Sequence, residues 1–351
     1  MQERFVETTS RAQAGLHPAT VIQREMQSRA IERAKELLKD GTVVRVLGWK
    51  QGDLGYNPEP AYFGSPEELK DFVYDGFCGA NLSKYMIQAG KQEGKTLVFL
   101  KPCDTYSFNQ LIKEHRVSRE KTYIIGVGCK GTLDIDKVKN AGIKGIESIA
   151  AEGDTLKIQT IYGEKEFPFN DALLERCTVC KGKTHQVYDE LIGAEEGEEA
   201  GPVGNRFEMV EKLEAMTPKE RFAFWQGELS KCIRCNACRN ACPACSCLKC
   251  VFDSNKFDSA QKANVDTFEE QMFHVIRAFH VAGRCTDCGE CSRVCPQGIP
   301  LHLLNRKFIK DINEFYGPYQ AGEDTDSRAP LTDYTFEDVE PSVVTERGGK
   351  H

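Results

Sequence analysis

The sequence contains no apolar run that approaches the roughly 18 residues needed to span a membrane. Its first residues, MQERFVETTSRAQAG, also lack the apolar core of a secretory signal. Basic residues are not in excess, since 46 Lys and Arg against 53 Asp and Glu leave a net charge of −7, which disfavours nucleic-acid binding. We therefore expect a soluble, cytoplasmic protein with no membrane span, whose partners are proteins and small molecules.

Two catalytic patterns are also missing. No G-x-G-x-x-G follows any predicted strand, and the 7 histidines fall in no recognisable Ser/His/Asp or Cys/His hydrolytic arrangement. What the chain has instead is 16 cysteines. Disulfides persist mainly in oxidising compartments, whereas clustered cysteines in a cytosolic protein usually bind metal or perform redox chemistry. Metal binding is therefore favoured.

Hydrophobic patterning predicts an α/β N-terminal domain with a mostly parallel sheet. An amphipathic helix is expected over 20–40, and apolar runs at 43–47, 97–100 and 122–128 alternate with helical patterns. Residues 155–169 resemble a hairpin on the edge of this domain.

The second half of the chain differs in composition. It is helical and cysteine-rich, with Cys-Pro pairs typical of a ferredoxin-type module, and an acidic, glycine-rich stretch precedes it. The predicted division is an α/β domain at 1–193, a linker at 194–216, a helical ferredoxin-type dicluster domain at 217–316, and an extended or disordered tail at 317–351 that lies across a partner.

The dicluster domain is predicted from a cysteine spacing that occurs twice. Cys232-x2-Cys235-x2-Cys238-x3-Cys242-Pro is followed by Cys285-x2-Cys288-x2-Cys291-x3-Cys295-Pro. This is the bacterial ferredoxin spacing, in which three cysteines hold one [4Fe–4S] cluster and the fourth ligates the other. One cluster should take Cys232, Cys235, Cys238 and Cys295, and the other Cys285, Cys288, Cys291 and Cys242. Structural zinc is the alternative, but zinc favours two pairs of ligands in a tetrahedron.

The segment between the two copies is predicted to be a helix with a core-facing side. Its apolar residues recur at helical spacing: Phe268, Met272, Phe273, Ile276 and Phe279. The helix histidines His274 and His280 are expected to pack or to hydrogen-bond beside a cluster rather than to ligate iron. Four charges stand beside the ligands and could tune the cluster potentials or steer partners, but for each one alone ordinary solvated surface is the expectation: Lys231, Arg234, Arg284 and Arg293.

A third site is predicted from dispersed cysteines. Cys103 and Cys129 follow two strands of the predicted sheet, and Cys177-x2-Cys180 comes after the hairpin. Strand ends in a parallel sheet emerge at one edge, where ligand sites gather. Spacing alone leaves three alternatives for these thiols, namely an iron–sulfur cluster, zinc, or thiol exchange at Cys177 and Cys180.

These same motifs carry a resemblance to a known family. KPCD (101–104), IGVGC (125–129) and CTVC (177–180) resemble motifs in the beta subunits of deazaflavin-dependent (coenzyme F420) hydrogenases and formate dehydrogenases, and in heterodisulfide-reductase-linked relatives. The resemblance covers about 40–190 and the dicluster module. It implies a [4Fe–4S] cluster on Cys103, Cys129, Cys177 and Cys180, near a flavin. The stretch DGFCGANLSKYM (75–86) departs from the family's Ser- and Gly-rich FAD loops. If FAD binds, the candidate residues are Gly76, Gly79, Asn81 and Lys101.

Four cysteines remain: Cys78, Cys245, Cys247 and Cys250. Three of them crowd into PACSCLKC (243–250), a density that inert burial explains poorly. They are candidates for a fourth metal site, with second-shell or free thiols as the alternative.

The leading hypothesis is an iron–sulfur electron-transfer subunit of an anaerobic oxidoreductase complex. It would connect a catalytic partner, such as a hydrogenase, formate dehydrogenase or heterodisulfide-reductase-like assembly, to another redox carrier. One alternative is an FAD-containing subunit that itself oxidises or reduces a deazaflavin or nicotinamide cofactor. The other is a zinc-stabilised scaffold without redox activity.

Overall fold

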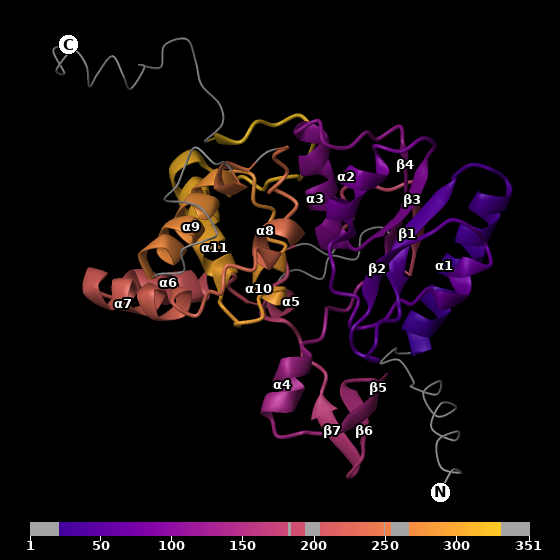
Figure 1. Ribbon diagram of the computed structural model, residues 1–351, viewed down its shortest axis with the longest axis horizontal. Helices are drawn as coiled ribbons and strands as arrows, with labels where there is room; N and C mark the ends of the chain where they lie inside the picture. The colour runs from indigo at the N-terminus through magenta and orange to yellow at the C-terminus, as the bar shows by residue number, and fades with distance from the viewer. Residues whose placement is uncertain (1–20, 182–183, 194–203, 249, 254–266, 331–351) are drawn as a thin grey trace, which may run out of the picture.

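The computed structural model describes residues 21–181, 184–193, 204–248, 250–253 and 267–330. An α/β domain and a helical domain lie side by side, and a small separate sheet projects from the α/β domain (Figure 1). None of the helices in these ranges combines the length and apolar character needed to cross a bilayer.

The main sheet has five strands in the order β2-β1-β3-β4-β8. Their bounds are β1 Arg45–Lys50, β2 Glu59–Phe63, β3 Thr96–Leu100, β4 Thr122–Val127 and β8 Glu190–Ile192. Strands β1, β3, β4 and β8 pair in parallel, and only the edge strand β2 is antiparallel. The central strand β3, TLVFL, is buried at every position, as a parallel strand covered on both faces must be. The predicted α/β domain with a mostly parallel sheet is confirmed.

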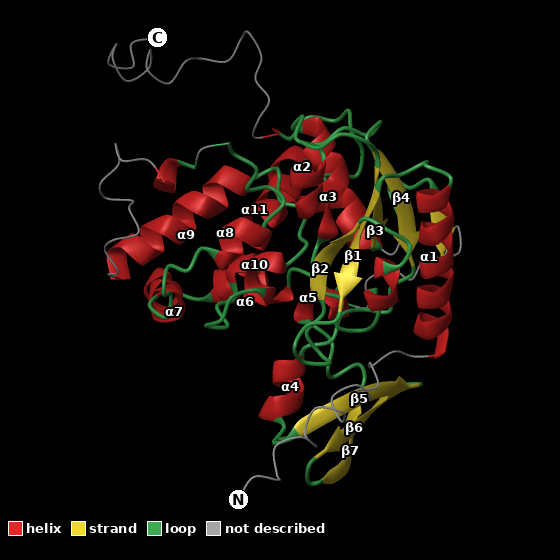
Figure 2. Ribbon diagram, turned by 45° about the vertical axis from the view of Figure 1, so that its right-hand side comes forward, coloured by secondary structure: helices red, strands yellow, loops and turns green. Residues whose placement is uncertain are grey.

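Helices cover the two faces of this sheet. Helix α1 (Val21–Lys39) lies on the outer face, while α2 (Met86–Ala89) and α3 (Pro102–Lys113) lie between the sheet and the helical domain (Figures 1 and 2). Two short 3-10 helices, η1 (Glu68–Asp71) and η2 (Leu82–Tyr85), precede α2 in the chain. Because α3 starts directly after β3, with proline in its first turn, Cys103 is placed at the carboxyl edge of the sheet.

The carboxyl end of β4 approaches other backbone closely. The amide of Gly128 donates to the carbonyl of Ile192 (3.0 Å), and a Cβ on Gly128 would overlap the carbonyl of Gly193. Only glycine permits this approach. It fixes the point at which the chain leaves β4 and reaches Cys129.

A buried histidine makes the stability of this edge depend on pH. His185 Nε2 donates to the carbonyl of Leu100 (3.1 Å), and burial lowers the pKa of the imidazole to about 4. Below about 6.5 the unfolded chain takes up a proton that the folded chain refuses, so stability is full above that pH and falls as pH drops toward 4, by up to about 3 kcal/mol. Anaerobic thermal unfolding between pH 7.5 and 5 should show this slope, and His185→Gln, which keeps a donor but does not titrate, should flatten it. An unchanged slope in the variant would contradict the assignment.

The predicted hairpin belongs to a separate sheet. Strands β5 (Ile146–Glu152), β6 (Thr155–Thr160) and β7 (Gly163–Pro168) form an antiparallel sheet of their own, next to α4 (Ile135–Asn140). The predicted hairpin therefore forms, but it pairs within a sheet of its own and not with the main sheet. The physical reason is that these strands bury a second core, distinct from that of the main sheet.

The helical domain is built from six helices within the described ranges. They are α6 (Glu208–Ala215), α7 (Pro218–Leu229), α8 (Ala237–Ala241), α9 (Thr267–Val281), α10 (Glu290–Arg293) and α11 (Leu301–Tyr316). Helix α6 lies inside the stretch predicted as linker, and its Val210 and Leu213 pack against Leu303 of α11. The rest of that stretch includes 194–203, which lies outside the described residues. Thus 208–215 belong with the helical domain.

The first part of the predicted tail returns to the body of the protein. Tyr319 donates its hydroxyl to the carbonyl of Gly283 (3.0 Å), and Asn109 of α3 donates to the carbonyl of Gly322 (3.1 Å). Residues 317–330 therefore tie the helical domain to α3 within this chain. Residues 331–351, for which contact with a partner was predicted, lie outside the described residues.

Ion pairs join the two domains. Arg176 of α5 (Glu175–Thr178) donates to Glu290 (2.8 Å), Arg306 donates to Glu175 (3.1 Å), and Arg284 pairs with Glu114 (2.6 Å). Arg176, Glu290 and Arg306 are largely withdrawn from water. Removing one partner of such a pair leaves an uncompensated buried charge, so the pairing fixes the orientation of the domains.

Candidate metal centres

Two loops of the same shape carry the repeated cysteines. In the first loop Arg234 and Asn236 have positive φ values of 53° and 62°, and in the second Asp287 and Gly289 have 54° and 66°. Each pair stands at the same spacing from the first cysteine of its copy. Left-handed residues turn the chain sharply, as a loop wrapped around one cluster must.

The fourth cysteine of each copy lies beside the triplet of the other. Burial raises the pKa of Cys232 and Cys238, and the nearby Cys295 thiolate raises both further. Cys242 has the same effect on Cys285 and Cys288. Because such repulsion requires proximity, the structure brings the predicted crossed sets together. The two sets also adjoin, since the Cys291 thiolate acts on Cys238.

Four of these eight thiols are buried, namely Cys238, Cys242, Cys288 and Cys291. Burial raises the pKa of Cys238 and of Cys288 to about 12, whereas Cys235 is exposed. Metal binds the thiolate form, so loading this site displaces protons that the buried thiols otherwise hold.

Neighbouring side chains point at the ligand sulfurs. His274 Nε2 lies 3.2 Å from Cys232 Sγ, and Asn305 Nδ2 lies 3.7 Å from Cys291 Sγ. His274 thus hydrogen-bonds beside the site, as its position in the sequence predicted. Such contacts orient ligands and tune potential without contributing a metal bond.

Arg277 of α9 is a buried cation that acts on thiols of both sets. Only 3% of the residue is exposed, and its Nη2 donates to the carbonyl of Cys238 (3.2 Å). Burial disfavours its charge, but the thiolates of Cys242 and Cys291 outweigh this effect and raise the pKa well above its ordinary value. Its Nε has no hydrogen-bond partner in the structure. A buried guanidinium with a spare donor fits the anionic surface of an iron–sulfur cluster.

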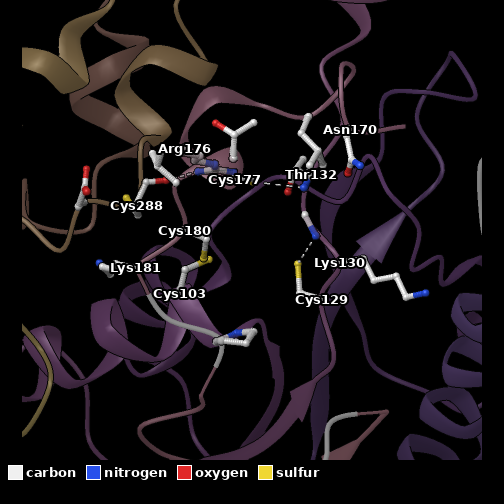
Figure 3. Close-up of a pocket in the computed structure, with 16 residues that line it drawn as sticks. Cys103, Cys129, Lys130, Thr132, Asn170, Arg176, Cys177, Cys180, Lys181 and Cys288 are labelled. Carbon is white, nitrogen blue, oxygen red and sulfur yellow. Dashed lines mark hydrogen bonds between the residues drawn. The ribbon is translucent and has the colours of Figure 1, made fainter. Parts of the chain in front are cut away.

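The four dispersed cysteines meet in one cavity. Cys103 from α3, Cys129 after β4, and Cys177 and Cys180 around α5 line a cavity of about 460 Å³ (Figure 3). The amides of Gly131 and Thr132 point at the sulfurs of Cys129 (3.4 Å) and Cys177 (3.3 Å). These four residues are the third site predicted from sequence, and the fold gathers them from segments far apart in the chain.

The third cavity also borders the dicluster domain. Cys288, a predicted ligand of the second set, lines the same cavity, and Arg176 donates to its carbonyl and to Glu290. Figure 3 shows Cys288 and Arg176 facing Cys180 and Cys103 across this space. Nothing in the sequence links Cys288 with CTVC, so only the structure reveals this adjacency.

Charge in the third cavity suits an anionic group. Lys181 lines it, burial lowers the pKa of its ammonium, and its Nζ has no hydrogen-bond acceptor in the structure. Burial raises the pKa of Cys129 to about 11 and that of Cys103 well above its ordinary value. Four thiolates around a [4Fe–4S] core carry net negative charge, and Lys181 and Arg176 would offset it. The donor set therefore fits such a cluster.

Among the described residues, no three His, Cys, Asp or Glu side chains converge closely enough to hold a single metal ion.

The surplus cysteines do not form a common group. Cys78 is buried in the core of the α/β domain, where it hydrogen-bonds with Asp75. Cys245 lies against Cys242, Cys247 is exposed, and Cys250 packs beside the core of the helical domain. The structure thus places Cys78 apart from the other three.

The residues named for a flavin are engaged in protein contacts. Lys101 pairs with Asp104 (2.9 Å) and donates to the carbonyls of Cys78 and Ala80. Asn81 receives a bond from Ser83 and donates to Ser107, the Gly76 carbonyl accepts from Leu133, and the Gly79 carbonyl accepts from Arg176.

Two expectations about side chains near the clusters are wrong. Arg234 is only 3% exposed and lies over the Phe273 ring, and Arg284 and Arg293 form ion pairs within the protein. On α9, Phe273 is buried as predicted, but Phe268 and Phe279 are 69% and 62% exposed. The apolar face of α9 is broader than its buried side, which no periodicity argument can show.

The comparisons with known proteins place the cysteine repeat in a defined family. Residues 228–299 match the family model of the 4Fe-4S dicluster domain. The chain is an iron–sulfur protein of the electron-transfer class, with ferredoxin-type clusters in its C-terminal half.

Two relatives that cover most of the chain are beta subunits of F420-dependent formate dehydrogenases. The beta subunit of F420-dependent formate dehydrogenase from Methanocaldococcus jannaschii is 25% identical, over 85% of this chain and 92% of that protein. The corresponding subunit of formate dehydrogenase 1 from Methanococcus maripaludis is 24% identical, over 90% and 95%. A chain of the F420-reducing [NiFe] hydrogenase complex from Methanosarcina barkeri is 13% identical with a TM-score of 0.34, over 46% of this chain and 63% of that one. The chain is thus similar over most of its length to beta subunits of F420-dependent formate dehydrogenases, the resemblance that its motifs predicted.

Proposed function

We propose that this chain relays electrons through three adjoining [4Fe–4S] clusters, between the catalytic subunit of a cytoplasmic redox complex and a second carrier. The relatives are named as subunits of F420-dependent formate dehydrogenases, so the partner proposed is a formate dehydrogenase or hydrogenase subunit and the carrier a deazaflavin.

The observation that carries the proposal is the position of Cys288. It belongs to the second crossed set and also lines the cavity of Cys103, Cys129, Cys177 and Cys180. The second set in turn adjoins the first through Cys291 and Cys238. The sites therefore follow one another in the order dispersed set (Cys103, Cys129, Cys177 and Cys180), second set (Cys285, Cys288, Cys291 and Cys242) and first set (Cys232, Cys235, Cys238 and Cys295). The first set includes the exposed Cys235.

The chain's own residues hold and insulate these sites. The clusters, when bound, supply one-electron chemistry. Burial excludes water from several of the thiols, Arg277 and Arg176 provide fixed positive charge, and the ion pairs between the domains hold the second set against the dispersed set. Fixed charge in a site shielded from water needs little reorganisation when an electron arrives.

A metal count tests the third cluster. Protein purified without air should contain about twelve iron atoms and about as many labile sulfides per chain, whereas a dicluster alone would give about eight. Cys129→Ser should lower the count by about four, because it removes a ligand from the dispersed set alone.

The control for this experiment is Cys78→Ala, which alters a cysteine outside every set and should leave the iron content unchanged. A count of eight in both proteins would overturn the third cluster. Zinc in place of iron would favour the scaffold hypothesis, and bound flavin would favour a flavin-bearing subunit.

A further inference from the structure

Two surplus thiols stand beside the second crossed set. The Cys245 thiol hydrogen-bonds the sulfur of Cys242, and its amide donates to the Cys242 carbonyl (3.2 Å). It also packs near Cys285 of the same set. Cys245 is therefore an inner thiol in contact with a cluster ligand.

Cys247 is the matching outer thiol. It is exposed, and it lines the same two cavities as Cys245, of about 610 and 380 Å³. The segment 245–247 is neither helix nor strand, so little regular structure hinders the two side chains from approaching each other. Cys247 is thus accessible from solvent and stands two residues from Cys245, which contacts the cluster ligand Cys242. Electrons from the relay could reach the protein surface through these two thiols.

Cations surround both cavities. Lys84 donates to the Cys245 carbonyl (2.7 Å) and lines both, Lys91 and Arg116 line the larger, and Arg239 and Arg284 line the smaller. The cavity walls also include apolar surface, with Leu248 almost fully exposed. Such a surface attracts a small anionic molecule.

We propose that Cys245 and Cys247 form a redox-active dithiol that reduces an anionic disulfide bound in these cavities. This inference rests on the proposed electron relay, because the relay supplies the electrons. It assigns the thiols a chemical role in place of the fourth metal site.

The reaction follows thiol–disulfide exchange. The Cys247 sulfur attacks one sulfur of the substrate, the substrate S–S bond breaks, and the first half leaves as a thiol after taking a proton. The Cys245 sulfur then attacks Cys247 in the mixed disulfide and releases the second half as a thiol. Two electrons, delivered singly by the relay, and two protons from solvent return the Cys245–Cys247 disulfide to two thiols. The sum is one disulfide, two electrons and two protons giving two thiols.

Glutathione disulfide, which is small and anionic, serves as the probe. The full-length protein with its clusters is reduced with dithionite, freed of excess reductant and mixed with the probe, all without air. Glutathione release should be at least tenfold slower in Cys247→Ser and unchanged in Cys78→Ala, whereas Cys245→Ser should release one glutathione and retain the other in a mixed disulfide on Cys247. After alkylation, peptide masses should show a Cys245–Cys247 disulfide in oxidised protein and two alkylated thiols in reduced protein.

Each other result overturns the proposal. If the visible absorption of the clusters bleaches on reduction but the masses of this peptide do not change, the dithiol is refuted and the relay stands. If Cys247→Ser loses iron or zinc, the thiols are metal ligands instead. If the wild type lacks labile sulfide, the relay itself fails and the dithiol fails with it.

Discussion

Replacing Cys242 with serine is expected to destroy the cluster of the second loop and to spare the cluster of the loop that carries Cys242. The reason is that the Cys242 thiolate acts on Cys285 and Cys288, while Cys295 takes the corresponding place beside Cys232. About four irons per chain should be lost. The second set stands between the other two. Electron transfer from the cluster of the dispersed set to the cluster that Cys235 binds should therefore fall to background.

Alkylation shows which cysteines each replacement uncovers. In Cys242→Ser the sulfurs of Cys285, Cys288 and Cys291 should become reactive toward iodoacetamide. In Cys295→Ser the reactive sulfurs should instead be those of Cys232, Cys235 and Cys238. Peptide mass spectrometry reads both patterns, and Cys78→Ala provides the background. If each variant exposes the triplet of its own loop, the crossed assignment is wrong.

The sequence predicts these ligand sets because the spacing itself carries the geometry. Three cysteines two residues apart can reach around one cubane only in a tight loop, and the proline after the fourth ends that loop. The parallel sheet was predictable for a similar reason, since a strand such as TLVFL, apolar at every position, must be covered on both faces.

Cysteine spacing could not predict which segments far apart in the chain come into contact. No local signal pairs Cys288 with the dispersed cysteines, because that contact depends on ion pairs between Arg176 and Glu290 and between Arg306 and Glu175. The dispersed set itself was found from strand ends and a family resemblance. Its Lys181, which lines the cavity, carries no signal in the sequence.

Unknown packing is also the reason that the arginines beside the ligands were wrongly expected at the surface. An arginine in a ligand loop resembles any solvated arginine until the packing around it is known. Arg234 is buried over Phe273, and Arg284 is held by Glu114. The sequence likewise gave no reason to single out Arg277, although the structure places it beside cysteines of both crossed sets.

Arg277→Gln is expected to lower the reduction potentials of both clusters of the dicluster domain. Each gains negative charge on reduction, and the buried guanidinium favours that charge. At roughly 7 Å and an effective dielectric constant of about 20, one unit charge contributes about 2 kcal/mol, equivalent to about 100 mV for one electron. Glutamine can still donate to the Cys238 carbonyl, which lies 3.2 Å from the arginine, so the loop should keep its shape. A redox titration followed by electron paramagnetic resonance measures both potentials.

Two further variants separate charge from packing. Arg277→Lys keeps the positive charge and should restore most of the potential, even though its ammonium cannot reproduce the guanidinium hydrogen bonds. Arg119→Gln removes an arginine that pairs with Asp189 on the α/β domain and should leave both potentials unchanged. Two results would contradict this prediction. One is that Arg277→Gln changes the reduction potential of one cluster alone. The other is that Arg277→Lys lowers both reduction potentials as far as Arg277→Gln does. A common shift that lysine reverses ties the two clusters to one buried cation, because no other change accounts for both.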